Sequence, residues 1–420
     1  MLDIKFIREN PDLIKEAARK KHVDFDVKEL LALDVLYREI LNLVEKLRAE
    51  QNKVTERVPQ SSPEEKEKLI LEMKQLKEHI KEKEEELRHQ REHLDELMLR
   101  VPNVPDVSVP EGESDLDNKE IKQVGEIPKF DFTPKDHLTI LENLDLADFE
   151  RGSKVSGFRG YFLKNAGALL CFALWQFALE QLVKKGFTPI IAPSKVKREP
   201  LKGCGFIPQH EEEVYRLTED EYLSGTAEVP VTSYYMDEIL DEKDLPKKFI
   251  AFSPCFRKEA GSYGRDVKGL IRVHEFFKLE QVILCEAKHE TSVAFHEEIT
   301  KNSEEIVQAL KMPYRVVLNC GGDLGLGQVK KYDIEVWMPS QEKYRETHSA
   351  SYFHDFQTRR LNIRYRGNDN EIRFVHSLNN TAVATPRILA CILENYQQAD
   401  GSVLVPEVLR KYIGLDVIKK

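Results

Sequence analysis

The sequence lacks three features that would each have pointed to a class of protein. No stretch approaches the roughly 20 apolar residues that span a bilayer, so we expect no membrane association. No Gly-x-x-x-x-Gly-Lys-Ser/Thr or Gly-x-Gly-x-x-Gly loop occurs, which argues against a P-loop or Rossmann nucleotide site. The amino-terminal stretch MLDIKFIRENPDLIKEAARKKH carries several acids and no unbroken apolar core, so it resembles neither a signal peptide nor a transit peptide.

Cysteine and basic residues are also limited. The 6 cysteines lie far apart and form no Cys-x-x-Cys pair, so a structural zinc site has no support. Isolated thiols in a long chain are typical of a reducing compartment and predict a cytoplasmic protein. The formal net charge of −10 argues against a generally basic surface for nucleic acid, but it leaves room for a local RNA site.

The 420 residues are enough for two or three domains, and the composition changes near residue 104. Residues 1–103 are helical in pattern and poor in glycine. Residues 104–120 are nearly aperiodic and rich in proline and acids, which predicts a linker. Residues 121–420 alternate helical and strand signals and predict a globular domain.

Two apolar runs with three- and four-residue spacing predict a coiled coil within residues 1–103. The intervening stretch VPQSSPEE breaks the helix, and Ser62 with the following acids restarts it. We therefore expect an antiparallel arm with about 30 residues, or about 45 Å, in each helix. The predicted seam consists of Leu33, Leu36, Ile40, Leu43, Leu47 and Val54 in the first run, and Leu69, Met73, Leu76, Ile80, Leu87 and Leu94 in the second.

The charge of this arm does not by itself indicate RNA binding. Residues 28–100 contain 15 Lys and Arg against 18 Asp and Glu, a net charge of −3. On pattern alone the arm is a dimerisation or spacer element, although basic side chains could line one of its faces.

The rest of the chain predicts an α+β fold with a mainly antiparallel sheet flanked by helices. GALLCFALWQFALEQLVKKG predicts a buried helix ending at Gly186, and FTPIIAP predicts a short strand. Further strands are predicted in the β-branched and aromatic runs KFIAFSP, FFKLEQVILC, YRVVLNC and YDIEVWMP.

The stretch CFRKEAGSYGRDVKGLIRVHEFFKLEQ, residues 255–281, carries the clearest chemical pattern. Side chains two apart in a strand share a face. Arg257 and Glu259 would therefore share one face, and Arg272, Phe276 and Glu280 would share a face on the returning strand. Arginine suits phosphate, a ring stacks on a nucleobase and a carboxylate suits an ammonium group. An elongated ligand such as an aminoacyl adenylate would fit. Spacing alone equally allows an exposed charged hairpin with Phe276 in the core.

The order of residues in FRKEAGSYGRDVKGLIRVHEFFKLEQ resembles motif 2 of class II aminoacyl-tRNA synthetases, specifically of the seryl-tRNA synthetases. GFTPIIAPSKVKREPLKGCGFIP is similar to motif 1, and HSLNNTAVATPRILACILENYQQADGSVLVPEVLRKYIG is similar to motif 3 and the family's terminus. LSGTAEVPVTS resembles the serine-binding stretch, and GDLGLGQVKKYDIEVWMPSQEKYRET matches the segment between motifs 2 and 3. The resemblance covers nearly the whole chain.

The resemblance implies a tRNA-binding arm (1–103), a linker (104–120) and a class II catalytic domain (121–420). It implies ATP-dependent ligation of L-serine to tRNA(Ser), and also to tRNA(Sec) where present, through seryl-adenylate. ATP and Mg²⁺ would be required, and the reaction would depend on positioning and charge rather than on a protein nucleophile. Helix 166–185 and strand 187–192 would form the interface of a homodimer, and GSYGRDVKG would be a mobile loop that meets the tRNA acceptor end.

Motif matching implies catalytic roles for Arg257, Glu259, Arg272 and Arg387. Arg257 would contact the α-phosphate, Glu259 would bind the adenine amino group or orient the arginine, and Arg272 would hold the β- and γ-phosphates. Phe276 would stack on adenine, and Arg387 would cover the other face of the base and reach the γ-phosphate. The residues implied to bind ATP are Arg257, Lys258, Glu259, Arg272, Val273, Phe276, Glu346, Thr347, His348, Ser349 and Arg387.

Glu346 would also hold Mg²⁺, although taken alone it could be an ordinary surface acid. Glu280 would face the ammonium group of serine. A pocket that reads the hydroxyl would reject alanine and glycine, because unpaired buried polar groups penalise the wrong ligand. The implied serine-binding residues are Thr226, Ala227, Glu228, Glu280, Asn379 and Thr381.

Two stretches depart from the family pattern. Motif 3 usually reads Asn-Gly-Ser-Gly, whereas this chain has NNTA at residues 379–382, where Asn380 would suit a positive φ. THSASYFHDFQ, residues 347–357, stands where the family commonly has Ser-Ser-Cys-Ser-Asn-Cys before Asp-Phe-Gln. Both departures leave the groups implied to bind ATP in place and bear on the selection of serine.

Two other functions remain to be compared with a seryl-tRNA synthetase. One is a non-catalytic paralogue that kept the arm and dimer as an RNA-binding or interaction module. The other is a paralogue that activates another small amino acid for a carrier protein. The presence of Arg257, Glu259, Glu280, Glu346 and Arg387 favours an enzyme, and the arm argues against the carrier-protein paralogue.

Overall fold

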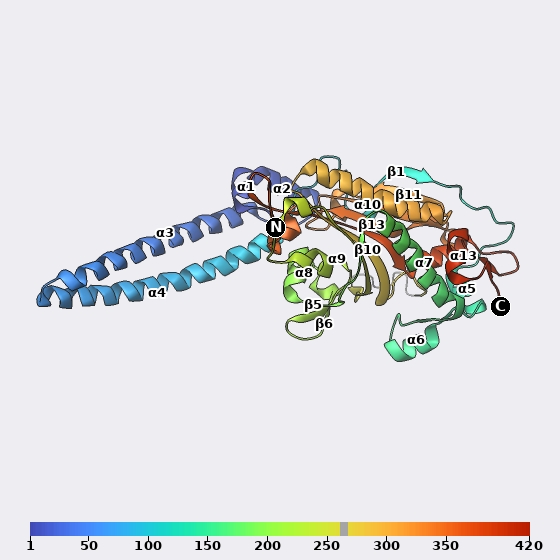
Figure 1. Cartoon of the computed structure of the whole chain (residues 1–420), viewed down its shortest axis with the longest axis horizontal. Coiled ribbons are helices and arrows are strands. Elements are labelled where there is room, and N and C mark those ends of the chain that lie inside the picture. The colour runs from blue at the N-terminus through green and yellow to red at the C-terminus, as the bar shows by residue number, and fades with distance from the viewer. Residues whose placement is uncertain (261–267) are drawn as a thin grey trace. The chain divides into compact units, whose positions relative to one another are not determined.

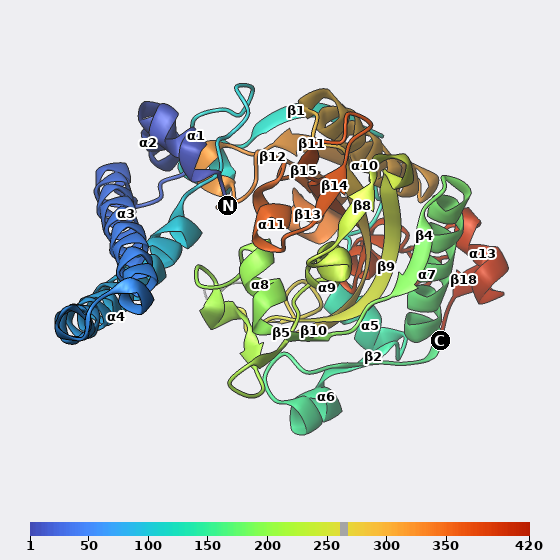
Figure 2. The same cartoon turned by 60° about the vertical axis from the view of Figure 1, so that its left-hand side comes forward.

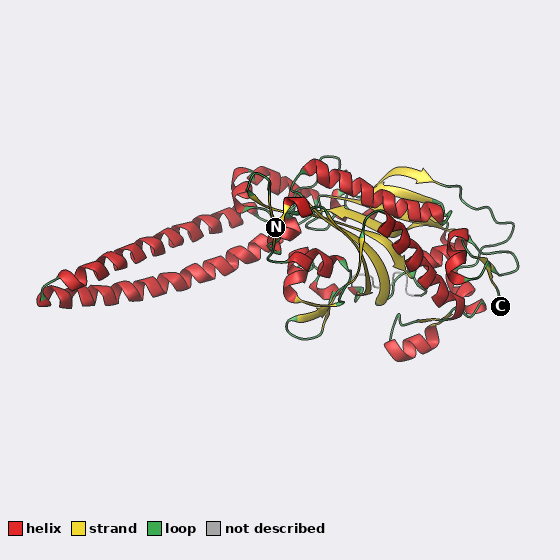
Figure 3. Ribbon diagram, viewed as in Figure 1, coloured by secondary structure: helices red, strands yellow, loops and turns green. Residues whose placement is uncertain are grey.

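The computed structural model describes residues 1–260 and 268–420, which divide into two compact units. Residues 2–19 and 23–102 form a helical unit, and residues 1, 20–22 and 103–420 form a unit that contains all described strands (Figure 3). The predicted α+β class, with a helical arm and a mainly antiparallel sheet, is confirmed. The predicted domain boundaries stay a prediction, and residues 261–267 of the predicted loop GSYGRDVKG lie outside the described residues.

The helical unit consists mainly of α3 (Val27–Arg57) and α4 (Pro63–Arg100), which lie side by side (Figure 1). Two shorter helices, α1 (Ile4–Glu9) and α2 (Pro11–Lys20), precede them. Asp26 caps α3 by accepting a hydrogen bond from the Lys28 N–H, and Ser62 and Glu65 form a capping box at the start of α4. The predicted break and restart are therefore confirmed.

The α3 half of the seam differs from the prediction at two positions, whereas Leu69, Ile80 and Leu94 of the predicted α4 half are buried. Leu36 and Leu43 are 41% and 36% exposed, whereas Val44, which was not predicted, is 2% exposed. From Leu33 the seam positions of α3 step by four and then three residues, and they pass through the half-buried Tyr37. The prediction stepped by three and then four residues. Both phases pass through leucines, so hydrophobicity alone does not distinguish them.

A buried carboxylate joins α1 to α3 within the helical unit. Asp34 accepts hydrogen bonds at 2.7 Å from both Nε and Nη2 of Arg8, and at 3.1 Å from Nε of Arg38. Its side chain is only 2% exposed. A carboxylate removed from water requires such cationic partners, because an unpaired buried charge is strongly destabilising.

In the described part of the second unit, eight strands form the main sheet in the order β1–β11–β12–β13–β16–β10–β9–β4 (Figure 2). All neighbours are antiparallel except β4 and β9. The strands are β1 Lys119–Val124, β4 Thr188–Ile191, β9 Lys247–Phe256, β10 Glu275–Cys285, β11 Tyr314–Leu318, β12 Lys330–Met338, β13 Lys343–Tyr352 and β16 His376–Thr385. The strands predicted in FTPIIAP, KFIAFSP, FFKLEQVILC, YRVVLNC and YDIEVWMP are all present.

Smaller sheets and helices surround the main sheet. The short strands are β2 Ala147–Asp148, β3 Phe162–Leu163, β5 Lys195–Lys197, β6 Tyr215–Arg216, β7 Glu221–Leu223, β8 Ile239–Asp241, β14 Arg364–Arg366, β15 Ile372–Phe374, β17 Val403–Leu404 and β18 Val417–Ile418. The helices are α5 His137–Asn143, α6 Phe149–Ser156, α7 Asn165–Lys184, α8 Arg198–Cys204, α9 Glu228–Thr232, α10 His289–Ala309, α11 Phe356–Arg360, α12 Arg387–Asn395 and α13 Glu407–Ile413.

Helices α7, α10 and α12 contribute to the main core together with one set of residues from the sheet. Along β10, Leu279, Ile283 and Cys285 belong to this core. Because side chains alternate along a strand, the even-numbered residues Phe276 and Lys278 are left for the opposite face. That face carries the cleft described below.

Helix α7 is long and apolar enough, by length and composition, to cross a membrane. The expectation that no stretch approaches such a composition is therefore wrong for this helix. Its residues Leu170, Leu174 and Phe177 are buried in the main core, which accounts for much of its apolar character. On its other side, Leu169 and Phe172 remain 46% and 62% exposed.

The predicted linker is hydrogen-bonded to the sheet-containing unit. The Asp106 N–H donates to the Val329 carbonyl at 2.9 Å, and its carboxylate accepts from the Tyr352 hydroxyl at 3.1 Å. Just before it, the Asn103 amide donates to the carbonyls of Gly327 and Phe353. The segment thus has defined partners despite its lack of periodicity.

The seam predicts that two substitutions in α3 destabilise the arm by different amounts. Val44→Ala should destabilise the arm by roughly 1–2.5 kcal/mol, because it removes fully buried methyl groups. Leu36→Ala removes more carbon atoms but should cost less than about 1 kcal/mol, because the side chain is substantially exposed. Hydrogen exchange of α3 and α4 amides in the full chain measures both. If Leu36→Ala lost more amide protection than Val44→Ala, the seam predicted from the sequence would be correct instead.

Candidate active site

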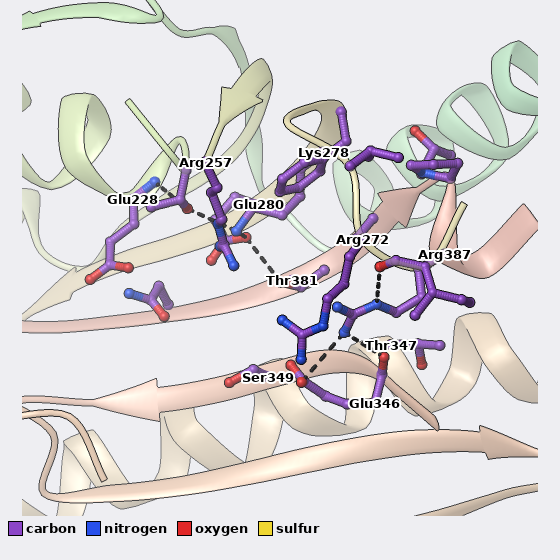
Figure 4. A pocket seen from close by; sticks show the side chains of 18 of the residues that line it. Glu228, Arg257, Arg272, Lys278, Glu280, Glu346, Thr347, Ser349, Thr381 and Arg387 are labelled. Atoms are coloured by element: carbon purple, nitrogen blue, oxygen red, sulfur yellow. Dashed lines mark hydrogen bonds and ion pairs between the residues drawn. The ribbon is translucent and has the colours of Figure 1, made fainter. Parts of the chain in front are cut away.

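A cleft lies on the face of the main sheet opposite the helix-covered core, and β10, β13 and β16 contribute side chains to it. Most residues implied by the sequence come together there (Figure 4). Those that line the cleft are Thr226, Glu228, Arg257, Glu259, Arg272, Val273, Phe276, Glu280, Glu346, Thr347, Ser349, Asn379, Thr381 and Arg387.

Three implied residues are not among those that line the cleft. Ala227 is completely buried at the start of α9, so only its backbone is suited to contact a ligand. The Lys258 ammonium lies 5.9 Å from the ring centre of Tyr215. His348 is buried, with Nε2 3.1 Å from the Ala382 carbonyl oxygen.

The charged residues of the predicted hairpin reach the cleft by a route that strand alternation did not predict. Strand β9 ends at Phe256 and β10 begins at Glu275, so Arg257, Glu259 and Arg272 all lie in the connection. Glu259 has a φ of 55°, which is incompatible with a strand. The pair Phe276 and Glu280 does lie on one strand, as predicted.

The arginines of the cleft contact carboxylates, backbone carbonyls and an aromatic ring. Arg272 Nη1 donates to Glu259 Oε2 at 2.9 Å. Arg387 Nη1 donates to the Glu346 carbonyl at 2.7 Å and lies 3.4 Å from its carboxylate. Arg257 Nε donates to the Gly225 carbonyl at 3.3 Å, and its guanidinium carbon is 5.4 Å from the Phe276 ring centre. Figure 4 shows Arg257, Arg272 and Arg387 directed into one space.

Glu346 lies among these cations. The Glu346 side chain is 47% exposed, and partial desolvation of its carboxyl acts to raise its pKa. Arg387, Lys331, Arg257 and Arg272 outweigh that effect and hold the pKa below its usual range. The carboxylate is therefore ionised at neutral pH and able to act as an oxygen ligand.

The inner end of the cleft contains a lysine whose role sequence analysis missed. Lys278 Nζ lies 2.5 Å from Glu280 Oε2 and donates to Thr226 Oγ1 at 2.8 Å. Lys278 and Glu280 are 5% and 2% exposed. The signal was present in the alternation of residues 272–280, where Lys278 occupies one of the regular positions.

Glu228 stands beside this pair as a second carboxyl group. Burial, together with the negative charge of Glu280, raises the pKa of Glu228 to about 7. The side-chain amide of Gln357 donates to Glu228 Oε1 at 2.7 Å. The Ser377 hydroxyl donates to the side-chain oxygen Oε1 of Gln357, also at 2.7 Å. Glu228 is thus oriented by neutral partners and takes up a proton readily.

The loop before β12 and the first residues of β12 supply Gln328 and Lys331, which the sequence did not single out. Gln328 Nε2 donates to the Ser351 hydroxyl at 2.8 Å, and Lys331 Nζ lies 3.4 Å from Asp333 Oδ2. Lys21 Nζ donates to three carbonyls of this loop, at 3.1, 2.9 and 2.6 Å. The cleft-lining residues that were missed are Phe206, Leu270, Ile271, Lys278, Gln328, Lys331, Ser351, Ala384, Thr385 and Pro386.

The two departures from the family pattern meet inside the protein. Asn380 lies in β16 without a positive φ, so that reason for asparagine does not apply. Its amide instead donates to the Ile299 carbonyl and the Ser303 hydroxyl of α10. Ala382 is the extra residue where the β10–β16 register shifts, and its carbonyl oxygen contacts His348 Nε2.

The arrangement suits a ligand that carries both anionic groups and a cationic group. Three guanidinium groups favour phosphate oxygens, which they can bind through two donors at once. Two carboxyl groups at the inner end favour an ammonium group. The ring of Phe276, which also lines the cleft, offers a surface for a base.

Two protein-family models match the chain. The model for the seryl-tRNA synthetase N-terminal domain matches residues 1–105. The model for the class II tRNA synthetase core domain (G, H, P, S and T) matches residues 210–396.

Full-length relatives agree with these matches. The serine–tRNA ligase of Deinococcus radiodurans is 50% identical over 99% of this chain and 98% of its own length. That of Thermodesulfovibrio yellowstonii is 45% identical over all of both chains. The seryl-tRNA synthetase of Pyrococcus horikoshii complexed with ATP is 42% identical, with a TM-score of 0.92 over 100% of this chain and 99% of the other. The cytoplasmic enzyme of Naegleria fowleri in complex with AMP is 35% identical, with a TM-score of 0.88 over the same shares.

Glu228 should titrate near pH 7 when no ligand is bound. Because its folded pKa is raised above the unfolded value, its contribution to stability is full at low pH and is lost as pH rises toward 7. Carboxyl ¹³C NMR of glutamate-labelled protein, with Glu228→Gln to assign the signal, measures this. Glu346 provides the internal control, since its signal should remain that of a carboxylate through the same range.

Proposed function

This chain belongs to the seryl-tRNA synthetase family, and we propose that its cleft forms seryl-adenylate from L-serine and ATP before the seryl group passes to tRNA(Ser). The chain is a class II serine–tRNA ligase that uses ATP. One observation carries the assignment of the cleft: three arginines and the buried carboxylate of Glu280 line a single cavity.

In the first step an oxygen of the serine carboxylate attacks the α-phosphorus of ATP, and the bond to pyrophosphate breaks. Arg257 would contact the α-phosphate, where negative charge builds up in the transition state. Arg272 and Arg387 would hold the outer phosphates, and release from Glu259 and Glu346 would free them to do so. Phe276 would stack on adenine, and Val273 would contribute backbone.

The serine pocket would consist of the residues around Lys278. Glu280 would accept the ammonium group, and Thr226, Asn379 and Thr381 would meet the polar atoms of serine. Each of these three side chains is less than 10% exposed. A ligand that lacked the hydroxyl would leave buried polar groups unpaired, which penalises alanine and glycine.

The residues present fit a magnesium ion that enters with ATP. Glu346 offers an ionised carboxylate beside Ser349, which also lines the cleft. Within residues 1–260 and 268–420 no group of three or more histidine, cysteine or acidic side chains could hold a metal alone. One carboxylate combined with phosphate oxygens is a usual environment for Mg²⁺. When bound there, the ion would neutralise phosphate charge.

A homodimer in which the arm of one subunit guides tRNA to the other is part of the proposal. Support comes from apolar side chains exposed on α7 and β4, including Phe172 and Ile191, which are 62% and 83% exposed. The arm itself supports RNA binding only through its length and its family match. A cytoplasmic location is supported by the 6 cysteines, which are all free and buried. Charging of tRNA(Sec), where present, is part of the same proposal.

The non-catalytic alternative is not favoured, because the charged residues implied to act in catalysis are retained and most of them share one cleft. A carrier-protein paralogue is disfavoured by the match of residues 1–105 to the family's amino-terminal domain.

ATP–pyrophosphate exchange tests the first step. The wild-type chain should exchange with serine and not with alanine or glycine. Arg257→Ala should lower exchange at least 100-fold, because removing one donor to developing charge typically costs 10²–10³-fold. Arg373→Ala is the matched control, since that arginine pairs with Asp369 at the exposed surface. Exchange with another amino acid but not with serine would overturn the substrate assignment.

Removal of the arm separates the two steps. Replacing residues 28–100 with a short glycine-rich connection should leave serine-dependent exchange within a few-fold of wild type and abolish charging of tRNA(Ser). The reason is that the cleft residues lie outside the helical unit. Exchange and charging are measured on the same preparation. Undiminished charging would show that the arm does not serve tRNA binding.

A further inference from the structure

Lys278 occupies a position inside the serine pocket that the proposed reaction does not yet explain. Its ammonium is nearly removed from solvent and contacts both Glu280 and Thr226. Figure 4 shows Lys278 and Glu280 along the wall that also carries Thr381. A lysine buried to this degree is rarely found unless it is paired, so the partners of its ammonium group determine its role.

The hydroxyl of Thr226 has both of its lone pairs engaged. Its oxygen accepts from Lys278 Nζ at 2.8 Å and from the Glu228 N–H at 3.2 Å. A threonine hydroxyl has two acceptor lone pairs and one hydrogen. In this arrangement Thr226 can only donate further, so a ligand atom that meets it must be an acceptor oxygen.

One oxygen of the Glu280 carboxylate is occupied by protein donors. Oε2 receives both the Lys278 ammonium at 2.5 Å and the Thr381 hydroxyl at 3.3 Å. This leaves Oε1 as the acceptor for a donor on the ligand. Lys278 therefore orients a donor at Thr226 and an acceptor at Glu280, which together match the oxygen and ammonium groups of an amino acid.

Lys278 also sets the charge of the pocket. Its ammonium places one cation beside the carboxyl groups of Glu228 and Glu280, and it acts to lower the pKa of Glu228. The other titratable neighbours come from several elements: Cys204 on α8, Cys255 on β9 and Arg257 beyond β9. Burial raises the pKa of both thiols, so they remain neutral.

We propose that Lys278 is a positioning residue that sets the hydrogen-bond polarity and net charge of the pocket for the amino-acid substrate. The proposal rests on the proposed function, because it takes the inner end of the cleft as the serine site. It assigns Lys278 no contact with the reacting atoms. Its effect is transmitted through Thr226 and Glu280.

The test is the serine and ATP dependence of pyrophosphate exchange in Lys278→Met. We expect the KM for serine to rise at least 30-fold, while the KM for ATP stays within threefold. Loss of the cation should also raise the pKa of Glu228, because Lys278 acts to lower it. The pH below which the serine KM begins to increase should therefore move upward by at least one unit, which a merely structural role would not produce.

A double-mutant cycle checks the route of the effect. Thr226→Val removes the hydroxyl while keeping the shape of the side chain. If Lys278 acts through Thr226, the serine KM of the double variant should be well below the product of the two single effects. Multiplicative effects, or an equal rise in the KM values for serine and ATP, would overturn the proposal.

Folding and the proposed function are controlled separately. If Lys278→Met fails to bind ATP, Lys278→Gln replaces it, because glutamine keeps a donor and removes only the charge. A serine KM within threefold of wild type in the variant that folds contradicts the proposal. Absence of serine-dependent exchange in the wild-type chain would instead reject the proposed function itself.

Discussion

The site depends on one constraint, which is that β10 must serve two environments at once. Leu279 and Ile283 must join the apolar core under the helices, while Phe276, Lys278 and Glu280 must face the cleft. Strand alternation satisfies both demands only while the register with β9 and β16 is kept. A slip of one residue would bury the ion pair in the core and expose the apolar residues, so core packing selects the arrangement of the site.

Ion pairs inside the cleft explain why several arginines can lie close together there. Each interaction of Arg272 with Glu259 and of Arg387 with Glu346 limits the cost of bringing several cations together before any ligand binds. Phosphate oxygens can replace these carboxylates without leaving an unpaired charge, provided the carboxylates gain a metal ion or solvent. The Lys278–Glu280 pair is different, because both side chains are almost fully buried and have no comparable access to solvent.

Sequence reasoning located most of this site because its residues occur in compact, ordered stretches. It did not locate the route by which they meet. Alternation placed Phe276 and Glu280 correctly, but Arg272 and Glu259 reach the cleft from the connection between two strands. Lys278 was passed over because a lysine between two assigned positions looks like a solvated charge. Gln328 lies in the loop before β12 and Lys331 at the start of β12, and both reach the cleft through tertiary contacts that no local sequence pattern marks.

The unusual residues of motif 3 were expected to act on serine selection directly, and their contacts indicate a more indirect route. Of the three substituted positions, only Thr381 lines the cleft, where its hydroxyl donates to Glu280. Asn380 binds α10, and the Ala382 carbonyl at the bulge contacts His348, which belongs to the second unusual stretch. The two departures therefore touch each other inside the protein. Asn380 and Ala382 act on serine through the position of Thr381, and so through the carboxylate that Lys278 holds. Thr347, Ser349 and Ser351 of the second stretch line the cleft themselves, so their influence on a ligand is direct.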